Sequence, residues 1–149
     1  MASIQQLYTV IKVEKRKEDA LLRQYQEAKQ YVFAHQQKLT GLEQYKVEYL
    51  KLIHQKTRDG IDAKTLIQHQ NFLAKLDKAC HQQIQVINQG VMVEQQRKRQ
   101  WITQQQKTNA VKTLLEKQTK QQQILESQRE QKQFDEIACQ QFIRAKSYY

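Results

Sequence analysis

A heptad spacing in the first third of the chain restricts the fold more than any other feature. Fourteen positions from Leu7 to Ile53 follow alternating steps of four and three residues, and ten of them are apolar. This spacing returns side chains to one side of an α-helix, and its persistence predicts a coiled coil. The fourteen positions are Leu7, Ile11, Glu14, Glu18, Leu21, Tyr25, Ala28, Val32, His35, Leu39, Leu42, Lys46, Tyr49 and Ile53.

The composition favours long helices and a narrow apolar seam. The 149 residues include no proline, three glycines and 30 glutamines. Glutamine, lysine, glutamate and leucine lose little side-chain freedom in a helix, and without proline no helix is forced to break. Hydrophobic residues make up 39% of the chain, which suits a seam between two helices better than the core of a globule.

The clearest turn signal is Asp59-Gly60. Glycine can adopt positive φ after a helix, and Asp62 is a suitable N-cap for the helix that follows. We therefore predict an all-α fold: a long two-helix antiparallel coiled-coil hairpin whose second helix is the longer. The predicted single domain spans residues 1–149, with a helix over 4–54, a turn over 56–62 and a helix over 63–146.

The seam of the second helix is harder to assign. Its spacing slips between Leu76 and Ile84 and again after Trp101, which we interpret as coiled-coil discontinuities. The residues assigned to it are Leu66, Leu73, Leu76, Cys80, Ile84, Ile87, Val91, Trp101, Leu115, Leu125, Phe134 and Ile137.

A tight turn at Gly60-Ile61 places residues opposite one another when their numbers sum to about 121. The predicted pairs are Tyr49 with Phe72, Tyr45 with Leu76, Leu42 with Ala79, Lys38 with Gln83, and Tyr31 with Gly90. The N-terminal end of the first helix then lies opposite about residue 120, so the rest of the second helix projects unpaired. Apolar residues on such a projection need a partner.

No catalytic or metal-binding constellation is recognisable. The sequence has no glycine-rich phosphate loop and no nucleophile elbow, so we expect no enzyme activity and no cofactor. Asp77 and His81, beside Cys80, are too few ligands for a metal site. Cys80 and Cys139 are expected to be free thiols. With no signal peptide and no apolar membrane span, we expect a protein that is soluble and cytoplasmic, or peripheral to a larger structure.

The net charge of +10 favours an acidic partner, and charge alone does not choose among nucleic acid, an anionic membrane and an acidic protein. The sequence contains two clusters of basic residues. Nucleic-acid binding is the more specific interpretation of them, and a surface exposed to solvent without a partner is the simpler one. Against nucleic acid, no aromatic stacking platform accompanies the clusters. They are Lys12, Lys15, Arg16 and Lys17, followed by Arg97, Lys98 and Arg99.

Four bulky residues near the turn form one predicted patch: Tyr45, Tyr49, Phe72 and Leu76. Aromatic side chains are large for a two-helix seam and must be partly exposed, as they are in many binding hot spots. Ordinary seam packing explains the same residues equally well.

Several short motifs, taken in order, resemble the flagellar export protein family FliJ over essentially the whole chain. They are Tyr45-x-x-x-Tyr49, Gly60-Ile61, Gln70-x-Phe72-x-x-x-Leu76, Arg99-x-Trp101 and the run Glu130-Gln131-Lys132-x-x-Asp135-Glu136. The resemblance implies a non-enzymatic stalk, similar to that of rotary ATPases, in the flagellar type III export apparatus. It implies binding to the export ATPase FliI, the export gate protein FlhA and export chaperones, at the cytoplasmic face of the inner membrane.

The resemblance also implies a gate-binding surface on both helices near the turn. Its residues are Lys38, Leu42, Tyr45, Tyr49, Phe72, Leu76, Ala79 and Gln83. Lys38 and Gln83 depart from the family pattern, which has glutamine and histidine there. The ATPase-binding surface corresponds to the paired helix ends, which are basic here. A basic coiled coil that binds nucleic acid is the alternative function.

Overall fold

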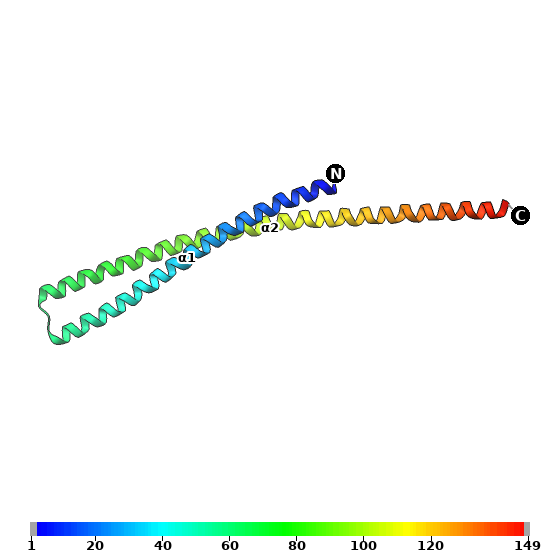
Figure 1. Ribbon diagram of the computed structural model, residues 1–149. Helices are drawn as coiled ribbons and strands as arrows, with labels where there is room; N and C mark the ends of the chain where they lie inside the picture. Colours follow the sequence, from blue (N-terminus) through cyan, green and yellow to red (C-terminus); the bar gives the residue numbers. More distant parts are fainter. Residues whose placement is uncertain (1–2, 148–149) are drawn as a thin grey trace. The chain divides into compact units, whose positions relative to one another are not determined.

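The computed structural model describes residues 3–147 and consists of two helices. Helix α1 spans Ile4–Asp59 and helix α2 spans Ala63–Ser147 (Figure 1). The chain is therefore an all-α hairpin with the longer helix second, as predicted. Helix α1 continues five residues past the expected residue 54, which shortens the connection to residues 60–62.

Local hydrogen bonds account for where the helices begin and end. Ser3 and Gln6 form a capping box. The backbone N–H of Gln6 donates to Ser3 Oγ at 3.2 Å, and the backbone N–H of Ser3 donates to the side-chain Oε1 of Gln6 at 3.0 Å. Gly60 has a φ of +91°, as its place after α1 predicts, and its amide donates to the Thr57 carbonyl at 3.3 Å. The Asp62 carbonyl accepts from Leu66, the first hydrogen bond of α2.

The chain divides into two compact units, each containing a part of both helices. The terminal unit comprises Met1–Glu18 and Gln104–Tyr149. The turn unit comprises Asp19–Thr103 and includes the connection between the helices. The expected organisation as a single domain stays a prediction.

The buried side of α1 follows the predicted heptad. All fourteen positions from Leu7 to Ile53 are buried or half-buried, including the polar residues Glu14, Glu18, His35 and Lys46. Most positions between them are exposed. The 4–3 spacing therefore identified the inward side of this helix even where charged residues occupy it.

The buried side of α2 is more regular than the sequence suggested. From Leu66 to Gln118 the inward positions follow steps of three and four residues without interruption. The predicted discontinuities near Leu76–Ile84 and after Trp101 are wrong, because polar residues fill the seam there. The inward positions that the apolar pattern missed are His69, Gln83, Gly90, Glu94, Arg97, Gln104, Thr108, Val111 and Gln118.

The prediction placed Leu125, Phe134 and Ile137 in this seam, but all three are exposed, because the inward positions of α2 stop at Gln118. Ile84 is a further correction to the predicted seam. Its side chain is exposed, and the neighbouring Gln83 is buried in its place. The apolar core of the turn unit consists of Val32 on α1 with Leu76, Cys80 and Ile87 on α2.

Gly90 brings the two helices close together in the turn unit. A Cβ at this position would lie 3.2 Å from Val32 Cγ2 and 3.3 Å from the Tyr31 ring. The predicted pairing of Tyr31 with Gly90 is thus present. The missing side chain of glycine leaves the space that these two residues fill.

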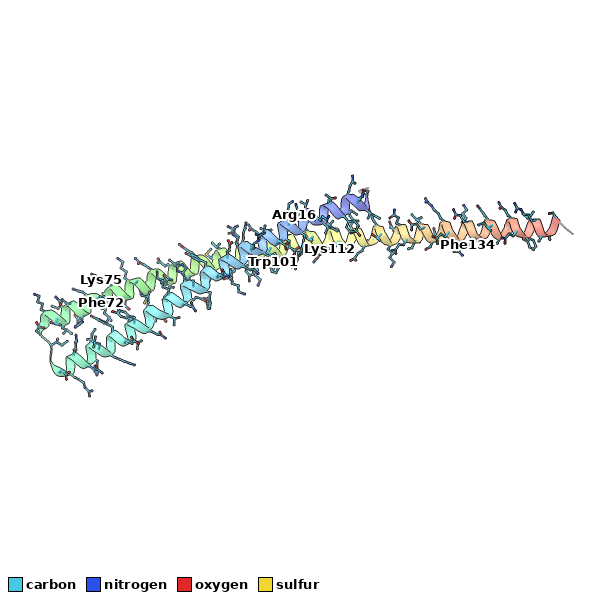
Figure 2. The ribbon with its side chains drawn as sticks, in the orientation of Figure 1. Arg16, Phe72, Lys75, Trp101, Lys112 and Phe134 are labelled. Atoms are coloured by element: carbon cyan, nitrogen blue, oxygen red, sulfur yellow. The ribbon has the colours of Figure 1, made fainter. Side chains whose placement is uncertain are left out.

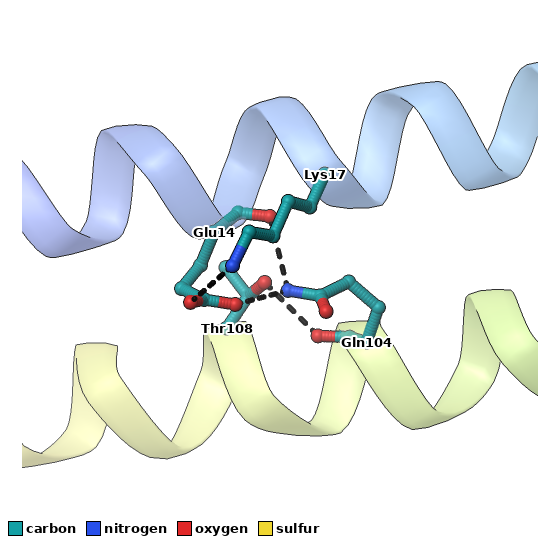
Figure 3. Close-up of polar contacts among 4 residues, drawn as sticks. All are labelled: Glu14, Lys17, Gln104 and Thr108. Atoms are coloured by element: carbon teal, nitrogen blue, oxygen red, sulfur yellow. Dashed lines mark hydrogen bonds and ion pairs between the residues drawn. The ribbon is translucent and has the colours of Figure 1, made fainter.

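The terminal unit has an unusually polar seam. Leu7 is buried, but so are Glu18, Gln104 and Thr108, and Thr108 has no exposed surface at all. Figure 3 shows Gln104 between the two helices, with its amide donating to the carboxylate of Glu14 and to the Glu14 carbonyl. Buried polar groups require such partners, and each one also fixes the register of the two helices.

Candidate partner-binding surface

Three aromatic side chains from both helices meet in the turn unit. The ring centroids of Tyr49 and Phe72 lie 4.8 Å apart, those of Tyr45 and Phe72 6.2 Å apart, and those of Tyr45 and Tyr49 6.4 Å apart. Tyr45 is 49% exposed and Phe72 is 37% exposed. The cluster, which we call the aromatic patch, therefore combines packing between helices with surface open to solvent.

The heptad explains why the patch is partly exposed. Tyr49 occupies a seam position, while Tyr45 and Phe72 lie beside the seam. The Tyr49 hydroxyl and Nδ1 of His69 share a hydrogen bond of 2.5 Å, and their rings lie 5.5 Å apart. His69 thus anchors the Tyr49 side chain, whose ring lies next to those of Tyr45 and Phe72.

Sequence reasoning missed His69 as a member of this cluster. The residue is polar and falls between the apolar seam positions Leu66 and Leu73, so it was not counted. The regular three-and-four spacing from Leu66 would have identified it.

The eight residues of the predicted gate-binding surface differ in how accessible they are. Lys38, Tyr45 and Phe72 are exposed, and the seam residues Leu76 and Gln83 are buried. The remaining three, Leu42, Tyr49 and Ala79, are half-buried. Buried residues can support this surface, but the exposed ones must make most of the contact with any partner.

The predicted pairing of Lys38 with Gln83 is wrong. The side-chain amide nitrogen of Gln83 instead lies 2.7 Å from Nδ1 of His35 and donates to the backbone carbonyl of His35 at 3.0 Å. His35 and Gln83 are both seam positions, whereas Lys38 points outward. This polar pair stabilises the seam and leaves Lys38 on the surface.

An ion pair adjoins the aromatic patch. The Lys46 ammonium contacts the Asp77 carboxylate across the two helices. The hydrogen bond that the Lys46 ammonium donates to the Asp77 carboxylate raises the pKa of Lys46. Asp77 is one of the two possible metal ligands in the sequence, but it pairs with Lys46, and the other, His81, is exposed. Within residues 3–147, no three His, Cys, Asp or Glu side chains gather where they could hold a metal.

A family model describes nearly the whole chain. The model of the flagellar FliJ protein matches residues 3–147. The chain belongs to the FliJ family. FliJ is a non-catalytic family, and its members are components related to flagellar protein export. Neither the curated proteins nor the solved structures include a match to this chain.

Beyond the paired part, this FliJ chain has a long exposed helical segment. Every residue of α2 from 121 to 147 is exposed, and we call this segment the tail. Figure 2 shows Phe134 on it, and 71% of this side chain is exposed. No helix in residues 3–147 is long and apolar enough to cross a membrane.

The apolar side chains of the tail do not lie along a single stripe. Ile124 and Phe142 are 18 residues apart, about five turns, and therefore share one side of the helix. With about 100° of rotation per residue, Phe134 lies about 80° to one side of them and Ile137 about 140°. Leu125 lies about 100° to the other side. Together they occupy about two thirds of the circumference.

The basic residues are distributed unevenly in the terminal unit. Residues 104–120 carry four lysines and one glutamate, whereas residues 121–147 carry equal numbers of basic and acidic side chains. Part of the N-terminal basic cluster is paired internally, with Lys17 3.5 Å from Glu14 and Lys15 3.6 Å from Glu18. The excess positive charge of this unit therefore lies along its paired part.

Proposed function

We propose that this FliJ chain is a non-enzymatic stalk of the flagellar type III export apparatus. In this proposal it binds the export ATPase FliI through the terminal unit and the export gate protein FlhA through the aromatic patch. ATP hydrolysis belongs to the ATPase, and the chain transmits its effect by binding. The family membership supports this placement at the cytoplasmic face of the inner membrane.

The tail is the observation that carries the stalk proposal. Its apolar side chains point to about two thirds of the helix circumference, so one flat partner surface would leave several of them in water. A partner that surrounds the helix covers them all, and the central opening of a ring has this geometry. The balanced charge of the tail suits an apolar lining. The basic paired part suits acidic residues at the entrance of the ring.

The aromatic patch supports the gate-binding part of the proposal. Tyr45 and Phe72 offer large, partly exposed rings that pack against Tyr49, and the Tyr49 hydroxyl is hydrogen-bonded to His69. Binding hot spots are enriched in aromatic residues of this kind, because they bury a large area at a small loss of side-chain freedom. Lys38 contributes a positive charge at the edge of the same surface. Escort of export chaperones is proposed from the family alone, and no residues are assigned to it.

Nucleic-acid binding is the second candidate, favoured only by the net charge of +10. One member of the second basic cluster is already engaged, since Arg97 donates to Gln24 Oε1 across the helices at 3.3 Å. Nucleic-acid binding would weaken steeply with added salt and would not depend on Tyr45 or Phe72.

A capture experiment separates the two candidates. The immobilised chain is incubated at near-physiological salt with a bacterial lysate, with and without nuclease, and FliI and FlhA are detected by antibodies. We expect both proteins to be retained in both samples. Retention of nucleic acid alone, with nothing left after nuclease, would favour the second candidate and exclude the stalk.

A further inference from the structure

The first fifteen residues of α1 form a segment with its own seam in the terminal unit. This N-terminal arm, residues 4–18, packs against residues 104–118 of α2. Only three of its five inward residues are apolar: Ile4, Leu7 and Ile11. On α2 they face a strip in which only Val111 and Leu115 are apolar. Half of the seam positions here are therefore polar.

Four of the five polar positions gather at one end of the arm, where it continues into the rest of α1. Gln104 donates to the Glu14 carboxylate and, at 3.2 Å, to the Glu14 carbonyl. The Lys17 ammonium lies 3.5 Å from the same carboxylate (Figure 3). Thr108 is fully buried, and its hydroxyl donates within its own helix to the Gln104 carbonyl at 3.0 Å. We call Glu14, Glu18, Gln104 and Thr108 the polar layer.

A layer of this kind stabilises the pairing weakly. The hydrogen bonds of Gln104 and Glu14 replace hydrogen bonds to water, so their net gain is small, whereas apolar residues at the same positions would gain free energy from burial. Glu18 is a buried carboxylate, and burial of a charge offsets much of what its ion pair with Lys15 contributes. The arm is thus held mainly by Leu7 and its few apolar neighbours.

From this distribution we propose that the arm is a releasable element. Residues 4–18 open from residues 104–118 as one cooperative segment, by local unfolding that leaves the seam of the turn unit intact. The polar layer marks the boundary of the opening segment. Opening uncovers the apolar side chains of Val111 and Leu115 on α2.

Amide hydrogen exchange of the full chain, followed by mass spectrometry, tests the proposal. Peptides within residues 5–18 are compared with peptides within residues 32–46 of the turn unit. If the arm opens cooperatively, all peptides within residues 5–18 should show the same low protection from amide exchange. Ordinary fraying of a helix end instead predicts protection that rises steadily from the first residue, and that result would overturn the proposal. Equal protection of the two segments would also overturn it.

Substitutions in the polar layer test its role as the boundary. In the variant with both Glu14→Leu and Gln104→Leu, the protection of residues 5–18 should rise by at least about fivefold, because a matched apolar pair replaces a desolvated polar one. Gln104→Leu alone should lower it, because Glu14 loses its donor. Protection that is unchanged in both variants would contradict the proposal.

Thr108→Val is the matched control for these variants. It keeps the shape of the side chain and removes a hydroxyl that bonds only within α2. Protection of residues 5–18 in this variant should equal or exceed that of the parent chain, and a fall would contradict the assignment of Gln104 as the residue that links the helices.

Discussion

Tyr49 on α1 and His69 on α2 are joined by a hydrogen bond of 2.5 Å, and the Tyr49 ring packs against the exposed side chains of Tyr45 and Phe72. The pair links the stability of the turn unit to the surface proposed to bind the export gate. A polar contact in the seam thus has a structural role and supports the candidate site.

Tyr49→Phe removes the hydroxyl and keeps the ring. The free energy of unfolding should fall by about 0.5–1.5 kcal/mol, the usual net contribution of a hydrogen bond, because His69 loses its partner. Urea unfolding followed by circular dichroism measures this change. Tyr45→Phe is the control, since the Tyr45 hydroxyl makes no hydrogen bond within residues 3–147, and it should change stability by less than about 0.5 kcal/mol. Equal effects in the two variants would contradict the account.

The stability of the terminal unit should depend on pH through Glu14. The hydrogen bond from Gln104, with help from Lys17, lowers the pKa of Glu14 below its ordinary value of 4.5. The ionised carboxylate therefore stabilises the fold above pH 4.5, and this contribution is lost as the pH falls from 4.5 through the lowered pKa.

Urea midpoints measured between about pH 6 and about pH 3 test this dependence. Glu14→Gln should lose less stability on acidification than the parent chain, because the titrating group is gone. Glu126→Gln, in the exposed tail, is the control and should behave like the parent. If Glu14→Gln showed the same acid sensitivity as the parent, Glu14 would not be the responsible group.

Two glycines of this FliJ chain should respond in opposite ways to the same substitution. A Cβ added at Gly41 in α1 would have nothing within 4 Å. A Cβ added at Gly90 would lie 3.2 Å from Val32 and 3.3 Å from Tyr31. Gly41→Leu should stabilise the helix by about 0.5–1 kcal/mol, because leucine is the better helix former. Gly90→Leu should destabilise it by about 1–3 kcal/mol through overpacking. Thermal unfolding compares them, and stabilisation by both would show that the helices are not close at Gly90.

Truncation after Lys120 tests the role of the tail. Residues 121–147 make no seam contacts that the rest of the hairpin needs, so the truncated chain should keep its unfolding midpoint. Its binding to FliI should be impaired, because the apolar side chains of the tail are lost. Binding to FlhA is the internal control and should remain. Unimpaired FliI binding would place the ATPase-binding surface elsewhere.

The sequence predicted α1 better than α2 for a physical reason. In α1 ten of fourteen heptad positions are apolar, so the polar ones could be assigned by interpolation. In α2 the inward positions from Gln83 to Gln104 include Gly90, Glu94 and Arg97, and an apolar pattern cannot reveal them. Their burial depends on partners across the seam, such as Gln24 for Arg97, and those partners are known only once the helices are paired.

The candidate site was predicted in part for a similar reason. The contact of Tyr49 with Phe72 followed from the turn position and the spacing alone. The partner of Gln83 did not, because a shift of three residues along α1 exchanges the outward Lys38 for the inward His35. A constant sum of residue numbers cannot resolve which side chain of a helical turn points inward.

The most direct test of the proposed function is the affinity of the full chain for purified FlhA, measured by calorimetry for Phe72→Ala and for Ile67→Ala. Ile67 is exposed on the same helix and lies outside the predicted surface, so it is the matched control. The account predicts a loss of about 1–3 kcal/mol for Phe72→Ala, with unchanged helicity, and no significant loss for Ile67→Ala. Equal affinity of both variants and the parent chain would contradict the assignment of the aromatic patch as the gate-binding surface.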